Sequence, residues 1–241
     1  MSSYSEIEEK SVILSPKMGR KSRLLILIFL VLSFFTFSQK NTSDWRLKKY
    51  ESGIAVYTRN ATNSAFKELK SEVTIKTSLT SVVALIFDWE SYPEWVYRCG
   101  KSTTLKKISE TECIHYQTVI APWPVDSRDF VVDIKLEQDE KTKIVIITST
   151  CRSDFIPKIP DHVRITEFKA TWTLIPKEDG TVEIVYQLLV NPGGYVPAWM
   201  VNLAVVDGPF TTMFNMKDWV LKEKYQGAKF SFVKEKNITP N

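Results

Sequence analysis

The sequence has few residues of the kinds that usually carry catalysis or bind metals. Its 241 residues include only two histidines, His115 and His162, and three cysteines, Cys99, Cys113 and Cys151. The cysteines do not stand at CxxC spacing, and no HExxH, EF-hand or glycine-rich phosphate-loop pattern occurs. We therefore expect no metal, no cofactor and no conventional enzyme active site. The favoured interpretation of the cysteines is three small buried side chains, with at most one disulfide.

The sequence also lacks a strong excess of charge of one sign. It has 32 basic and 28 acidic residues, a net charge of +4, and without residues 1–38 the numbers fall to 27 and 25. No basic stripe interleaved with aromatic residues is present. We therefore expect no nucleic-acid partner. The 44% apolar content is enough for one sizeable core, which favours one domain preceded by a leader.

The apolar run near the N-terminus is short for a membrane-spanning helix. Leu24–Phe37 would rise about 21 Å as a helix, against roughly 30 Å for a hydrocarbon core. Basic residues precede the run and Thr36-Phe37-Ser38 ends it, which is the order of a secretory signal peptide. We expect residues 1–38 to be an N-terminal tail and signal peptide, making the protein secreted or periplasmic. The alternative is a membrane anchor at residues 24–37, and Met18 is an alternative start.

Alternating apolar residues from Trp45 onward predict an antiparallel sheet of seven to nine strands with one apolar face. Four sets alternate: Phe130, Val132, Ile134 and Leu136; Ile144, Ile146 and Thr148; Phe168, Ala170, Trp172 and Leu174; and Val182, Ile184, Tyr186 and Leu188.

Two helical patterns interrupt the strands. The first follows the capping candidates Ser78 and Thr80 and should end near Pro93; it has helical spacing at Val82, Leu85, Ile86 and Trp89. The second predicts a C-terminal helix of roughly 20 residues, kinked at Gly208-Pro209, with its apolar stripe at Trp199, Leu203, Val206, Phe210 and Met213. Only this helix is long enough to cover the sheet. The predicted fold class is α+β, a curved antiparallel sheet with a C-terminal helix over a hydrophobic cavity.

Four sequence blocks resemble START domains, the StAR-related lipid-transfer family. Residues 122–131 resemble the family's PxPxxxRDFV block, and residues 191–202 with Asp207-Gly208-Pro209 resemble its phosphatidylcholine-transfer-protein-like members. Ile54–Tyr57 and Val163-Arg164 resemble two further family strands, and the four blocks stand in the family's order.

The resemblance implies a helix-grip (START/Bet v 1-like) domain over residues 41–229, followed by a flexible tail at residues 230–241. Such a domain holds, and sometimes transfers, one lipid or other hydrophobic molecule. The loops expected to gate its cavity are Ala121–Ser127, Arg152–Asp161 and Asn191–Pro197. We expect a monomer that touches a membrane surface transiently.

By matching position, the expected ligand-binding residues begin with Arg128 and Asp129; Arg128 could instead pair with a carboxylate and fix its loop. The other candidates for lining the cavity or its gate are Trp123, Phe155, Tyr195, Trp199, Val206, Phe210 and Met213. For each of these, ordinary core packing is the alternative. Trp123 and Tyr195 are also candidates for membrane contact.

One departure from the family affects the expected ligand. Phosphatidylcholine-binding members carry an arginine and an aspartate in a YRxxWD pattern, where this chain has Tyr92-Pro93-Glu94-Trp95-Val96. Because Pro93 and Val96 cannot form that charged pair, phosphatidylcholine is disfavoured as the specific ligand.

Two other functions stay open at this point. Related helix-grip proteins include cyclases and hydrolases, and Cys113 and His115 share one face of a predicted strand. No third orienting group is spaced with them. A scaffold domain without a ligand is the other alternative.

Overall fold

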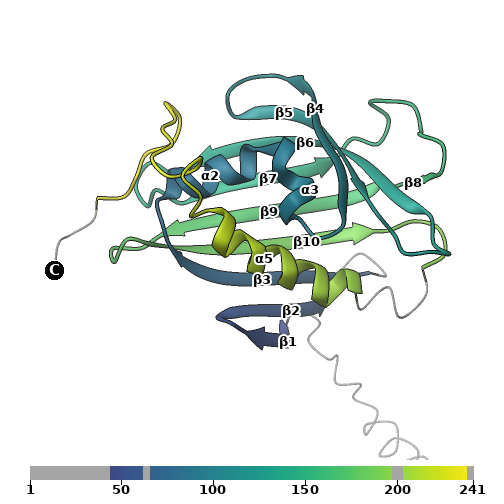
Figure 1. Ribbon diagram of the computed structural model, residues 1–241, viewed down its shortest axis with the longest axis horizontal. Helices are drawn as coiled ribbons and strands as arrows, with labels where there is room; N and C mark the ends of the chain where they lie inside the picture. The colour runs from purple at the N-terminus through teal and green to yellow at the C-terminus, as the bar shows by residue number, and fades with distance from the viewer. Residues whose placement is uncertain (1–43, 62–65, 197–202, 238–241) are drawn as a thin grey trace, which may run out of the picture. The chain divides into compact units, whose positions relative to one another are not determined.

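The central feature is one large sheet with its helices on a single face (Figure 1). The computed structural model describes residues 44–61, 66–196 and 203–237. The expected leader, the alternative anchor and Trp199 lie outside these ranges. Within the ranges, no helix combines the length and apolar character needed to cross a membrane.

Over the described residues the sheet has ten strands, slightly more than predicted, in the order β1-β2-β3-β10-β9-β7-β6-β5-β4, with β8 pairing in parallel with β6. The strands are β1 (Arg46–Glu51), β2 (Ile54–Asn60), β3 (Lys67–Lys76), β4 (Cys99–Lys107), β5 (Glu112–Val119), β6 (Ser127–Gln138), β7 (Val145–Cys151), β8 (His162–Arg164), β9 (Glu167–Pro176) and β10 (Thr181–Asn191).

The alternation predicted for β6, β9 and β10 places the correct residues on the inward, helix-covered face. For β7 the predicted face was wrong. Val145 and Ile147 are buried at 0% and 1% exposure, whereas Ile146 is 40% exposed. All four residues of Ile144–Ile147 are apolar, so the local sequence does not show which of them face inward. The pairing of β7 with its neighbours selects the inward residues, because Ile147 lies opposite the inward-facing Leu136 and Trp172.

The first helical region has two short helices joined by a turn. Helix α2 (Leu79–Phe87) begins after Ser78, whose Oγ accepts a hydrogen bond from Ser81 N at 3.1 Å, as the capping pattern predicted. The 3₁₀ turn η1 (Trp89–Ser91) leads to α3 (Tyr92–Trp95). Pro93 lies in the first turn of α3, where its missing N–H costs nothing, and so it starts a helix instead of ending one.

The C-terminal helix covers the inward face at the β2 and β3 side of the sheet (Figure 1). A π-helical turn, η2 (Leu203–Asp207), precedes α5 (Gly208–Trp219). Pro209 therefore stands in the first turn of α5. Phe210, Met213, Met216 and Val220 point into the core at 9%, 1%, 0% and 0% exposure.

The segment after α5 packs on the domain through residues 230–237, a stretch that the sequence analysis predicted to be a flexible tail. Val233 is 4% exposed, and the ring of Phe232 lies 6.5 Å from that of Phe87. The Glu235 carboxylate accepts hydrogen bonds from the free backbone N–H groups of Leu79 and Thr80, at 3.1 and 2.7 Å. The segment is thus fixed to the beginning of α2 by helix capping and to its end by aromatic packing.

Candidate ligand-binding site

The two charged residues of the RDFV block lie on opposite faces of β6. Alternation sends Phe130 and Val132 into the main core under the helices, and Arg128 shares their face. Asp129 and Val131 point the other way, where Val131 belongs to a second, smaller apolar cluster. These two predicted ligand-binding residues therefore lie on opposite faces of the sheet.

Arg128 connects two loops through backbone carbonyls. Its side chain is almost completely buried, at 3% exposure of the residue. The guanidinium donates from Nη1 to the carbonyl of Asp126, from Nε to that of Pro192 at 3.4 Å, and from Nη2 to those of Gly193 and Tyr195 at 3.3 and 3.4 Å. Burial lowers the pKa of Arg128. Among the described residues Arg128 has no ion pair, so the expected carboxylate partner is replaced by carbonyl oxygens.

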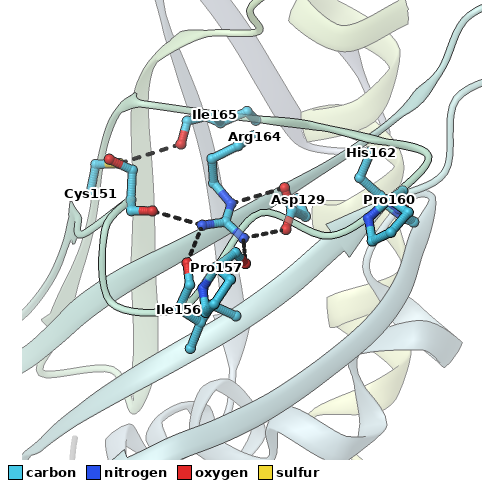
Figure 2. Close-up of polar contacts among 9 residues, drawn as sticks. Asp129, Cys151, Ile156, Pro157, Pro160, His162, Arg164 and Ile165 are labelled. Atoms are coloured by element: carbon cyan, nitrogen blue, oxygen red, sulfur yellow. Dashed lines mark hydrogen bonds and ion pairs between the residues drawn. The ribbon is translucent and has the colours of Figure 1, made fainter.

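Asp129 forms a buried ion pair with Arg164 of β8 (Figure 2). Arg164 Nε and Nη2 donate to the two Asp129 carboxylate oxygens at 3.0 and 2.8 Å, and the two side chains are 1% and 0% exposed. The hydrogen bonds to Asp129 raise the pKa of Arg164. The remaining donors bind loop carbonyls at 2.7 to 3.1 Å, those of Ser153, Ile156 and Pro157. Asp129 therefore connects β6 to the β7–β8 loop through Arg164, on the face of β6 opposite the main core.

The three loops predicted to gate the cavity meet at one end of β6. Strand β8 follows the β7–β8 loop and pairs with the first residues of β6. Gly193 packs against β8, since a Cβ there would lie 3.1 Å from Val163 Cγ1, and its φ of +62° also favours glycine. Arg128 binds carbonyls of the first and third loops, and Arg164 binds carbonyls of the second. The three loops are thus all attached near the beginning of β6.

The predicted lining residues divide into three groups. Trp123, Tyr195 and Phe155 are 91%, 85% and 37% exposed and thus lie on the outside of the loops, not on the inward face. Phe210 and Met213 are core residues of α5, and Val206 is half-buried in η2. The position of Trp199 is not among those described.

The inward face also has residues that the sequence analysis did not select. Phe168, Tyr186 and Val190 pack on the core yet are only partly buried. Ser71 of β3 lies directly opposite Tyr186 of β10, and His115 of β5 lies under the rings of η1 and α3. The alternation of β5 already places Cys113, His115 and Gln117 on one face, and this signal could have identified the histidine as an inward residue.

A family model of the START domain matches residues 35–223. The chain belongs to the START family. It is 30% identical over 176 residues to an uncharacterized protein of Pseudomonas aeruginosa, covering 72% of this chain and 85% of that protein. It is 25% identical to the human phosphatidylcholine transfer protein, covering 69% and 78% of the two chains.

Solved structures agree with this assignment of the START domain. The STAR-related lipid transfer protein from Xanthomonas axonopodis has 32% sequence identity and a TM-score of 0.68, covering 74% of this chain and 99% of that chain. Human StAR-related lipid transfer protein 5 shares the fold with a TM-score of 0.67 at 16% identity, over 83% and 97%. The predicted family and helix-grip fold are confirmed.

START domains with lipid-transfer relatives are generally binding domains and not enzymes, which agrees with the prediction for this chain. The Cys113–His115 alternative is also unfavourable chemically. Burial raises the pKa of Cys113 to about 11 and lowers that of His115 to about 4. The imidazole Nε2 is instead within 3.2 Å of Ser102 Oγ. A neutral imidazole beside a protonated thiol is not an activated nucleophile.

Proposed function

We propose that this START domain binds one lipid or other hydrophobic molecule between the inward face of the sheet and α5. The observation that carries the proposal is the partial burial of Phe168, Tyr186 and Val190. These side chains face inward and pack on the core, yet they keep accessible surface. An apolar ligand covering that surface would gain roughly 25 cal/mol per Å² of apolar area removed from water.

The names of the relatives support lipid as the ligand class, because they include phosphatidylcholine transfer proteins and STAR-related lipid transfer proteins. The residues of this chain do not support phosphatidylcholine itself as the ligand. Pro93 is exposed and Val96 is half-buried, and neither side chain can hold a charged headgroup. We therefore propose a lipid as the ligand, but not the phosphatidylcholine headgroup named for those relatives.

Exchange with a membrane is the second part of the proposal. Trp123 and Tyr195 are large aromatic residues on neighbouring loops, and both loops are tied to Arg128. Tryptophan and tyrosine favour the membrane–water interface, because one end of each ring system is apolar and the other can hydrogen-bond. We propose that a monomer touches the membrane through these two side chains while its ligand enters or leaves.

The third part of the proposal is the location of the protein in the cell, which we infer from residues 1–38. A basic segment, the apolar run Leu24–Phe37 and the small residues that end it support an extracytoplasmic protein, either released by cleavage near Ser38 or held by residues 24–37. Fractionation of cells expressing the full-length chain distinguishes the two forms, since only the anchored form stays with membranes at its full length.

Lipid analysis of the purified protein tests the proposed function. The chain is expressed at full length, purified without added lipid, and extracted with organic solvent for mass spectrometry. We expect one lipid class in near-stoichiometric amount and transfer of that lipid between donor and acceptor vesicles. If no hydrophobic molecule is recovered and none of the lipids offered in vesicles is taken up, the proposal is refuted.

A further inference from the structure

Residues 230–237 cross the end of the sheet that lies opposite the three loops predicted to gate the cavity. Those loops come before β6, after β7 and after β10. The turns from β4 to β5, from β6 to β7 and from β9 to β10 lie at the other end, because these neighbouring strands are antiparallel. We call this other end, where α2 also begins, the basal end. Figure 1 shows residues 230–237, in yellow, on this side, away from β8.

Three polar contacts join segment 230–237 to the basal end, one at or beside each turn. They are Ser231 with Glu110 at 2.9 Å, Lys234 with Gln138 at 2.8 Å, and Lys236 with Glu178 at 3.4 Å. The Lys234 contact is double, because the Gln138 side chain donates to the Lys234 carbonyl and accepts from its N–H. The segment is also bound to α2 through Glu235, so it leaves the basal end only if all these contacts break together.

Apolar side chains of segment 230–237 complete the core at the basal end. Val233 is 4% exposed and belongs to the main core, on which Phe230 and Phe232 also pack. The rings of Phe230 and Phe232 lie 5.0 Å apart, and the ring of Phe232 is 6.5 Å from that of Phe87 at the end of α2. The family model ends at residue 223, so this closure lies outside the START match.

Burial along β9 and β10 changes from the basal end to the loop end. Near the basal end, Leu174 of β9 lies opposite Ile184 of β10, and both are 0% exposed. At the loop end, Phe168 lies opposite Val190, and both are only partly buried although they pack on the core. The inward face is therefore closed at the basal end and keeps accessible surface toward the loop end.

The hydrogen bonds that hold the third loop are longer than those at the basal end. Arg128 reaches the carbonyls of Pro192, Gly193 and Tyr195 at 3.3 to 3.4 Å. The usual range for N–H···O bonds is about 2.7–3.2 Å. At the basal end, Glu235 accepts from the N–H groups of α2 at 2.7 and 3.1 Å. The loop end is thus the end that opens more easily.

Resting on the proposed function, we propose that segment 230–237 closes the basal end of the domain, so that the ligand enters and leaves only at the loop end. Trp123 and Tyr195 are exposed on loops of that end. Release of the ligand then depends on opening of the loops, which contact with a membrane promotes. Away from a membrane the ligand is retained.

Release of a bound probe to a soluble acceptor and to a membrane tests the closed basal end. The full-length purified protein is loaded with a pyrene-labelled fatty acid, and release is followed by fluorescence after mixing with serum albumin or with dioleoylphosphatidylcholine vesicles. Albumin takes up only probe that has left spontaneously, whereas vesicles can also contact the loops. For the unchanged protein we expect vesicles to speed release at least about fivefold over albumin.

Two variants open the basal end. One lacks residues 230–241, and the other combines Gln138→Ala with Glu235→Ala in the complete chain. We expect release to albumin to rise at least about tenfold in the deletion variant and to become insensitive to replacement of both loop aromatics by alanine. The double variant should change in the same direction. Deletion of residues 238–241 alone is the matched control, and the unchanged protein in urea, at equal residual stability, controls for general loosening.

The closed basal end is overturned if both variants release the probe to albumin no faster than the stability-matched protein. It is also overturned if release from the variants still depends on the loop aromatics, or if the unchanged protein releases the probe equally fast to albumin and to vesicles. In each of these cases the probe is bound and the proposed function stands. Failure to bind the probe, together with no lipid recovered by extraction, instead refutes the proposed function itself.

Discussion

Replacing Arg164 with methionine should destabilise the domain more than any ordinary surface change. The substitution leaves the Asp129 carboxylate at 0% side-chain exposure without its cation, and it removes the donors to three loop carbonyls. Removing one partner of a buried pair costs about 3–5 kcal/mol, a large part of a typical stability of roughly 5–15 kcal/mol. For a domain of this size that corresponds to a fall in Tm of about 6–20 °C. Urea unfolding followed by circular dichroism measures the loss.

Two further variants make this prediction refutable. Arg152→Met breaks an ion pair with Asp133 of similar length, 2.9 Å, but those side chains are 44% and 45% exposed, so its cost should stay below about 1 kcal/mol. Adding Asp129→Leu to Arg164→Met removes the uncompensated charge and should recover part of the loss. If Arg164→Met is no more damaging than Arg152→Met, the ion pair does not anchor the β7–β8 loop as inferred.

Three other predictions concern the segment 230–237, the buried imidazole and the exposed aromatics. Glu235→Ala should cost about 1 kcal/mol in urea unfolding, because it removes the carboxylate that caps α2; an unchanged midpoint would contradict this. The unfolded chain binds a proton at His115 near pH 6.5 and the folded chain only near pH 4, so stability should be full above pH 6.5 and fall by roughly 3 kcal/mol by pH 4. His115→Leu should reduce this slope, and an identical pH profile in the variant would refute the assignment. Trp123→Ala with Tyr195→Ala should slow transfer between vesicles severalfold while leaving Tm within about 2 °C, because both side chains are exposed; a large loss of Tm would indicate a structural role instead.

Local periodicity was enough to predict much of the fold. Clean alternation on β6, β9 and β10, the capping serine before α2 and the helical stripe of α5 each depend on neighbouring residues alone. The failures occurred where local sequence is ambiguous. The branched run Ile144–Ile147 reads equally well in either register, and only pairing with β6 and β9 selects its inward face. Residues 230–237 show no clear period, and their place becomes visible only when Glu235 is found at the beginning of α2, 155 residues away along the chain from Thr80.

The candidate site was predicted less well for the same physical reason. The motif Arg128-Asp129 supplied two adjacent candidates for ligand binding, but a strand sends adjacent side chains to opposite faces, and alternation alone could have separated them. The actual partner of Asp129 is Arg164, which the parallel pairing of β8 with β6 brings into contact. That pairing joins segments separated by a long loop and leaves no periodic signal in the sequence.

Two buried polar side chains of the inward face, His115 and Ser71, illustrate what sequence patterns alone do not contain. Alternation places His115 on the inward face, but a buried histidine in a satisfied core and one with a free ring nitrogen have the same pattern. The difference lies in whether a partner stands beside Nδ1, and Ser102 occupies only Nε2. The same holds for Ser71, which would be an ordinary strand serine if any acceptor faced it. Because β3 and β5 are far apart in the chain, the sequence alone does not show that these two side chains share one face of the sheet.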